Sequence, residues 1–137
     1  MVTNKSAIKV LIPSELGYEK VAMSVVAVTA QKIGFPEDKI EDLKTAVAEA
    51  CTNAIEHGNA LNQNAQIELI LVRTEQGIRI NIIDEGHQLM PTSIPDRADR
   101  NDFRGLGLYL MQALTDELEI KSEPGRNEIQ LTSYLPS

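Results

Sequence analysis

The chain has 137 residues, of which 42% are hydrophobic and 24% are charged, and its formal net charge is −7 at pH 7. This composition is typical of one folded domain and excludes an intrinsically disordered chain. No apolar run is long enough to cross a bilayer, and the acidic balance argues against direct binding to nucleic acid, which is itself a polyanion. We therefore expect neither a membrane nor a nucleic acid as a partner.

Two further features favour a cytoplasmic protein. Residues 1–6 lack the apolar core of a secretory signal peptide. The single cysteine, Cys51, cannot form an internal disulfide, which fits a reducing compartment. Because Cys51 lies on the apolar side of a predicted helix, we interpret it as a core residue rather than a nucleophile.

The N-terminal part of the chain predicts a strand followed by a helix. Residues 7–12 form the strand, and Pro13 ends it. Residues 15–33 form the helix, with Ser14 as its cap and Gly34 at its end. The apolar side of this helix consists of Leu16, Val21, Val25 and Val28.

A second helix is predicted to begin after Pro36, with acidic residues in its first turn, and to end at Gly58. Its buried side consists of Ile40, Leu43, Val47, Cys51 and Ala54. These spacings are those of an amphipathic helix that packs on a core.

The second half of the chain predicts two pairs of strands around a third helix. The first pair covers residues 66–74 and 78–82, and the second covers residues 118–122 and 127–134. The helix covers residues 105–116.

Residues 87–104 show no period, and a structureless segment of this length inside a compact domain is typical of a functional lid. The order of elements predicts a single domain over residues 1–137, of the α+β class. We expect a two-layer α/β sandwich, in which a mixed sheet carries its helices on one face.

Three motifs have the chemistry of a ligand site. In the first, Glu49, Asn53 and His57 recur every fourth residue, so they form one row on the second helix, roughly 6 Å apart along its axis. Glu49 could accept a proton from an attacking hydroxyl, and the amide oxygen of Asn53 is a suitable ligand for Mg²⁺. His57 could contact a phosphate or only stabilise the helix C-terminus. Taken alone, the row is better explained as a solvated helix face with a frayed end.

The second motif is Asp84-Glu85-Gly86, at the end of a predicted strand. A carboxylate there can accept the exocyclic amine of adenine, and a glycine permits close approach. An ordinary turn is the competing interpretation.

The third motif is Arg104-Gly105-Leu106-Gly107-Leu108, at the start of the third helix. Gly105 and Gly107 could bring a phosphate close to free N–H groups, and Arg104 could clamp one of its oxygens. A close-packed helix start explains the glycines equally well. We expect His87, in the lid, to be exposed.

Together these motifs resemble the N box and the two glycine boxes of the Bergerat-type (GHKL) ATP-binding fold. Within that superfamily the chain is similar, over nearly its whole length, to the bacterial anti-sigma factor serine/threonine-protein kinases. The resemblance implies a protein that binds ATP with Mg²⁺, sequesters a sigma factor, and phosphorylates a serine or threonine on an anti-anti-sigma (STAS) partner. It also implies a possible homodimer.

The resemblance implies a role for each matched residue. Glu49 would be the general base, Asn53 the magnesium ligand and Asp84 the adenine reader. The other residues implied to contact the nucleotide are His57, Gly86, Arg104, Gly105, Leu106, Gly107 and Leu108.

The sequence departs from the family pattern at two places. Gln88 stands where a second glycine often occurs, and Arg126-Asn127-Glu128 stands where a Gly-Thr pair is usual. Asn127 either replaces the threonine as a polar partner or leaves adenine affinity weaker.

Two functions compete at this stage. One is a protein kinase that is also a sigma-factor antagonist, and the other is a nucleotide-dependent protein-binding switch without phosphotransfer. Glu49 favours the kinase, because nucleotide binding alone needs no base.

Overall fold

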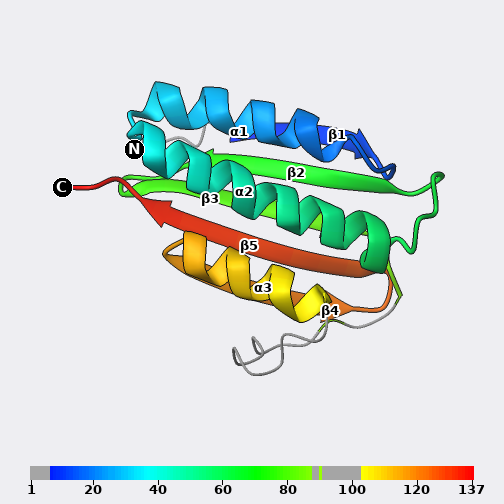
Figure 1. The fold of residues 1–137 in the computed structure, drawn as a ribbon. Helices are drawn as coiled ribbons and strands as arrows, with labels where there is room; N and C mark the ends of the chain where they lie inside the picture. The colour runs from blue at the N-terminus through cyan, green and yellow to red at the C-terminus, as the bar shows by residue number, and fades with distance from the viewer. Residues whose placement is uncertain (1–6, 88–89, 91–102) are drawn as a thin grey trace.

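The computed structural model describes residues 7–87, Met90 and residues 103–137 (Figure 1). The elements are β1 (Ala7–Pro13), α1 (Glu19–Ile33), α2 (Glu37–Asn53), a π-helical turn (Ala54–Gly58), β2 (Gln66–Arg73), β3 (Gly77–Asp84), α3 (Phe103–Leu114), β4 (Glu117–Glu123) and β5 (Arg126–Tyr134). The predicted order of strands and helices is confirmed, with ends that shift by a few residues. Most of the predicted lid, residues 87–104, lies outside the described residues.

The described strands form one sheet in the order β1-β2-β3-β5-β4, and each neighbouring pair is antiparallel. The predicted α+β class and two-layer sandwich are confirmed, but the prediction of a mixed sheet was wrong. The crossover through α3 does give β4 the same direction as β3. However, β5 turns back from β4 and lies between these two strands, so no parallel pair forms (Figure 1).

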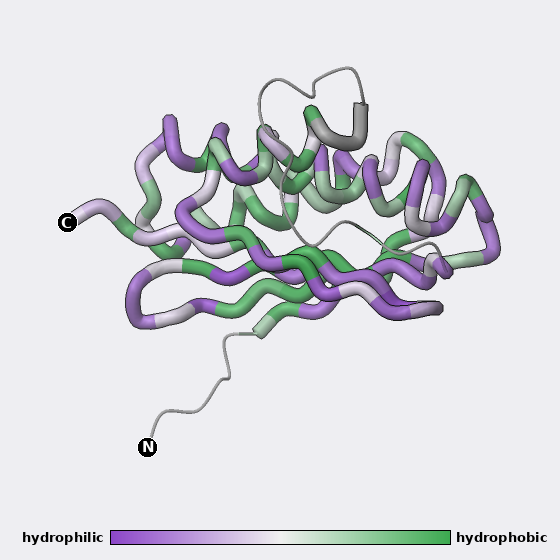
Figure 2. The backbone as a smooth tube through the Cα atoms, turned by 90° about the horizontal axis from the view of Figure 1, so that it is seen from below, coloured by the Kyte–Doolittle hydropathy of each residue, from purple (hydrophilic) through white to green (hydrophobic). Residues whose placement is uncertain are grey.

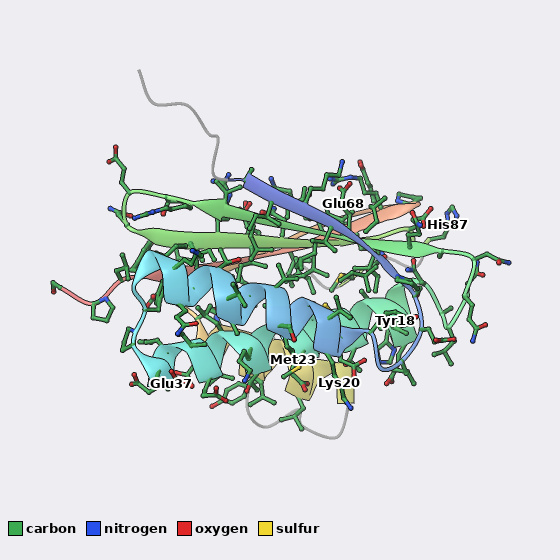
Figure 3. The ribbon with its side chains drawn as sticks, turned by 90° about the horizontal axis from the view of Figure 1, so that it is seen from above. Tyr18, Lys20, Met23, Glu37, Glu68 and His87 are labelled. Carbon is green, nitrogen blue, oxygen red and sulfur yellow. The ribbon has the colours of Figure 1, made fainter. Side chains whose placement is uncertain are left out.

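The helices lie on one face of the sheet, and the other face is open (Figures 2 and 3). Purple and green segments alternate along the strands in Figure 2, as expected when successive side chains point to opposite faces. The core-facing side chains of the sheet are almost fully buried: Ile67, Leu69, Leu71, Ile78, Ile80, Ile82, Ile129 and Leu131. Figure 3 shows Glu68 on the opposite, helix-free face. This open face carries an ion pair between Lys9 Nζ and Glu68 Oε2 at 2.8 Å.

The first helix differs most from its prediction. It begins at Glu19 rather than at residue 15, and Ser14 is no cap, because it is buried and its Oγ accepts a hydrogen bond from Asn59 Nδ2 at 3.0 Å. The residues of α1 that are buried in the core are Ala22, Val26 and Ala30. Small alanine side chains let α1 approach its neighbours closely, so the core lies beneath them rather than beneath the larger residues.

The predicted apolar side of this helix is therefore wrong for most of its members. Leu16, Val21 and Val28 are 53%, 44% and 58% exposed, and only Val25 packs partly against the core. The helix end is as predicted: Gly34 has a φ of 111°, and its N–H donates to the carbonyls of Ala30 and Gln31.

The second helix buries the predicted stripe of Ile40, Leu43, Val47 and Cys51, with Ala46 and Ala50 beside it. Cys51 is 1% exposed, so the prediction of a core cysteine is confirmed. Burial, reinforced by the charge of Glu19, raises the pKa of the Cys51 thiol to about 12. Within residues 7–87 and 103–137, no helix is long and apolar enough to span a bilayer.

Candidate functional site

The last residue of α2, Asn53, is the most unusual polar group of the fold. It is 7% exposed, and neither Nδ2 nor Oδ1 of its side chain has a hydrogen-bond partner among the described residues. An amide buried without partners typically costs about 1–3 kcal/mol, so native folds rarely keep one without a reason. The arrangement fits a side chain whose partner is a ligand.

Glu49 lies one turn before Asn53 and is half-buried. A Cβ atom at Gly107 would lie 3.2 Å from Glu49 Oε1, so the glycine lets α3 approach the carboxylate closely. The first and third sequence motifs are therefore adjacent in the fold, as the resemblance implies. The contact also accounts for Gly107, which lies in the second turn of α3 rather than at a helix start.

The other residues of the third motif take different positions. Arg104 and Gly105 lie in the first turn of α3, which begins at Phe103, and their side chains lie outside the described residues. Leu106 is half-buried, whereas Leu108 is fully buried in the core. A nucleotide contact at Leu108 would have to use the backbone, and contacts at these positions stay predictions.

Asp84 ends β3 and is 4% exposed. Its Oδ1 accepts hydrogen bonds from the Gly86 N–H at 2.8 Å and from Asn127 Nδ2 at 3.1 Å. A Cβ atom at Gly86 would lie 1.9 Å from the carbonyl oxygen of Gly58, so only glycine fits there. Another backbone thus approaches Gly86 closely, but it is that of Gly58 in the same chain and not a ligand.

Gly58 has a role beyond that of the helix stop predicted from the sequence. A Cβ atom on this residue would lie 2.1 Å from Asp84 Oδ2 and 2.3 Å from Asp84 Cγ. Gly58 therefore makes the space in which the Asp84 carboxylate lies. The Gly58 that follows His57 in the first motif was a visible signal, but only the fold shows what it contacts.

The α-helix changes to a π-helical turn at Ala54–Gly58, in which the Asn59 N–H donates to the Ala54 carbonyl at 2.7 Å. Turns of this kind occur often at functional sites. The wider turn interrupts the four-residue spacing, so His57 does not extend the row of Glu49 and Asn53 regularly. The half-buried His57 instead lines a hollow of about 460 Å³ together with Gly58, Glu85, Gly86 and His87.

A second residue that the sequence analysis missed is Asn59, which is 5% exposed. Its Oδ1 accepts a hydrogen bond from the Glu85 N–H at 2.8 Å, and its Nδ2 donates to Ser14 Oγ and to the Gln66 carbonyl. Asn59 thereby ties the end of the first motif to the second. His87 is exposed, as predicted, and Gln88 lies outside the described residues.

A site with these parts defines a class of protein. Residues 12–133 match the family model of the histidine kinase-like ATPase domain, and the chain belongs to this family. Among curated relatives, the serine-protein kinase RsbW of Bacillus subtilis is 31% identical, over 98% of this chain and 89% of the relative. RsbW from Bacillus licheniformis is 34% identical, over 90% of this chain and 80% of the relative. The predicted family of serine/threonine-protein kinases is confirmed.

Solved structures share the fold. The RsbU and RsbW domains of a Mycobacterium tuberculosis protein match with a TM-score of 0.72 and 22% identity, over 94% of this chain and 32% of that one. The SiaB–SiaC complex of Pseudomonas aeruginosa matches with a TM-score of 0.62 and 13% identity, over 90% of this chain and 87% of the matched one. Membership of an ATPase family implies that the protein binds a nucleotide.

Proposed function

We propose that the protein is a cytoplasmic serine/threonine-protein kinase that acts as an anti-sigma factor. It transfers the γ-phosphoryl group of ATP to a serine or threonine of a STAS-domain anti-anti-sigma protein, and it holds a sigma factor when that partner is phosphorylated. The observation that carries this proposal is the buried, unpartnered amide of Asn53, one helical turn after a half-buried carboxylate.

Asn53 fits a magnesium ion that arrives with the nucleotide. Mg²⁺ prefers oxygen ligands and keeps several waters, so one amide oxygen and the phosphates make a reasonable shell. Among the described residues there is no cluster of three His, Cys, Asp or Glu side chains that could hold a metal ion by itself. When bound, the ion would neutralise the charge of the triphosphate. Asp84 and Gly86 would hold the adenine, and the start of α3 would face the phosphates.

Glu49 would serve as the general base of the transfer. The hydroxyl oxygen of the partner forms a bond to the γ-phosphorus while the bond from that phosphorus to the bridging oxygen breaks, and ADP leaves. Glu49 takes the hydroxyl proton as this bond forms. Gly107 supports this role, because it keeps a side chain away from the Glu49 carboxylate and leaves room for an incoming hydroxyl.

The test is transfer of label from γ-labelled ATP, with Mg²⁺, to the cognate STAS protein. Glu49→Gln should lower the transfer rate by about 100-fold or more while ATP binding is kept. Glu41→Gln on the same helix is the matched control, because Glu41 is exposed and its carboxylate forms an ion pair with Lys44, and it should transfer at the wild-type rate. ATP binding by the wild type with no label transferred would support the competing switch instead.

We also propose that a second copy of the chain associates through β1 and α1. The large hydrophobic side chains that are exposed on α1 and on the turn before it are Leu16, Tyr18, Val21 and Val28, and Ile8 is exposed on β1. Figure 3 shows Tyr18 at the start of α1. An exposed apolar surface beside a free strand edge is a frequent association site.

Charge favours a second copy as the occupant of this surface. Residues 7–33 contain three Lys and two Glu, whereas the whole chain has a net charge of −7. The electrostatic repulsion between two acidic copies is therefore smallest when they contact each other through residues 7–33. Light scattering should show a dimer for the wild type and a monomer for Val28→Lys, whereas Thr45→Lys, at an exposed site on α2, should stay dimeric. A wild-type monomer at high concentration would refute this interface.

A further inference from the structure

Three polar side chains form a row across the core-facing side of the sheet. The strand register places Asp84 of β3 opposite Asn127 of β5, and Asn127 opposite Ser122 of β4. The next core-facing row, Ile82, Ile129 and Ile120, is entirely apolar. Two adjacent core-facing rows of the sheet therefore differ in character. One consists of isoleucines, and the next, at the end where Asp84 lies, consists of side chains that form hydrogen bonds.

Asn127 is the centre of this row and is only 1% exposed. Its Nδ2 donates to Asp84 Oδ1 at 3.1 Å and to the Gly86 carbonyl at 3.3 Å. Its Oδ1 accepts a hydrogen bond from Ser122 Oγ at 2.5 Å, and Ser122 Oγ accepts one from the Met90 N–H at 2.8 Å. Because both ends of the amide are engaged, its NH₂ group is directed at the Asp84 carboxylate.

A purely structural role does not account well for these groups. Burying polar side chains is unfavourable unless each finds partners, and an apolar residue at position 127 would have continued the neighbouring isoleucine row. Among the described residues, the side chain of Asn127 makes hydrogen bonds to Asp84 and Gly86 of the second motif and to Ser122, which orients its amide. Gly58 lies against the same carboxylate, with Oδ2 as the nearest atom to a built Cβ, whereas Asn127 donates to Oδ1. Both residues therefore restrict where the carboxylate can lie.

We propose that Asn127 is a positioning residue that fixes the direction of the Asp84 carboxylate and thereby sets the preference for adenine over guanine. This inference rests on the proposed function, in which Asp84 accepts the exocyclic amine of adenine. Guanine presents a carbonyl oxygen at the equivalent position, and a fixed carboxylate repels it. A carboxylate that can rotate repels guanine less. Loss of Asn127 therefore weakens ATP binding and reduces the difference between the affinities for ATP and GTP.

The experiment measures the affinities of ATP and GTP, each with Mg²⁺, by calorimetry. Asn127→Leu keeps the branched shape and the number of side-chain heavy atoms but removes both hydrogen-bonding groups, and it should lower the ATP-to-GTP affinity ratio by about tenfold. Asn81→Leu is the matched control. Asn81 is also a buried asparagine of the sheet, but it donates to Glu128 and Gln130 on the open face. Asn81→Leu should lower stability and leave the nucleotide ratio unchanged.

Ser122→Ala provides a second, milder test at a half-buried position, and it should lower the ratio by about threefold, because the amide of Asn127 loses one fixed partner. Folding of each variant is checked by its thermal melt. If folded Asn127→Leu or Ser122→Ala keeps the wild-type ratio within twofold, the positioning role is refuted. If the wild type itself binds neither nucleotide, the proposed function fails instead, so the two failures are distinguishable.

Discussion

Replacing Gly58 with alanine should disturb Asp84 before any other residue. The added Cβ atom would overlap the carboxylate at 2.1 Å from Oδ2 and 2.3 Å from Cγ. The carboxylate would have to leave its place and lose its hydrogen bonds to Gly86 and Asn127. At about 1.5–3 kcal/mol for each hydrogen bond to a charged group, the loss is about 3–6 kcal/mol. Alanine has a better helix propensity than glycine, which offsets about 1 kcal/mol of this loss in the free energy of unfolding. We therefore expect a net destabilisation of about 2–5 kcal/mol.

The assay is a double-mutant cycle by urea denaturation without nucleotide. Gly58→Ala is measured in the wild type and in Asp84→Ala, which lacks the atoms that the new methyl group would meet. In the Asp84→Ala background the same substitution should cost less than about 1 kcal/mol. Equal costs in the two backgrounds would show that Gly58 does not act through Asp84, and the reasoning would then be refuted.

Three further predictions concern other buried groups. Asn53→Ala should leave stability without nucleotide unchanged or slightly higher, because the amide has no hydrogen-bond partner in the part of the chain that the structure describes. It should also abolish the Mg²⁺-dependent part of the rise in Tm with ATP, and an unchanged rise would exclude Asn53 as the ligand. Burial would raise the pKa of Glu128, but hydrogen bonds from Arg126 and Asn81 and the nearby positive charges outweigh burial, so the pKa is lowered from its ordinary value of 4.5. A lowered pKa in the folded state adds stability above the unfolded-state pKa and loses it as the pH falls, so the stability difference between wild type and Glu128→Gln should shrink below about pH 4.5 in urea titrations. Finally, the buried Cys51 thiol, with its pKa raised to about 12, should resist alkylation at pH 8 in the native protein and react only after unfolding in urea.

The sequence predicted those parts of the fold that depend on local patterns. Alternating apolar residues located the strands, and Gly34 located the end of α1. The wrong face of α1 was chosen because large valines mark a stripe more strongly than alanines do. Only packing against neighbouring elements decides that Ala22, Val26 and Ala30 face the core.

The candidate site divides in the same way. Regular helical spacing was enough to place Glu49 and Asn53 together on α2. The same spacing did not place His57 and Gly58 correctly, because the π-helical turn changes the spacing and no local sequence pattern predicts such a turn. The contact of Asn127 with Asp84 depends on strand order and register, which join residues far apart in the sequence.

The position of β5 has a consequence for how the protein is made. This strand comes last among the described strands, yet it lies inside the sheet and supplies Asn127 beside Asp84. During synthesis, neither β3 nor β4 can pair with β5 until β5 has been made, and such long-range pairing is slow. A nascent chain in which Tyr134 has not yet left the ribosome should therefore lack the contact between Asn127 and Asp84, so the Asp84 carboxylate gains this hydrogen-bond donor only after β5 has emerged.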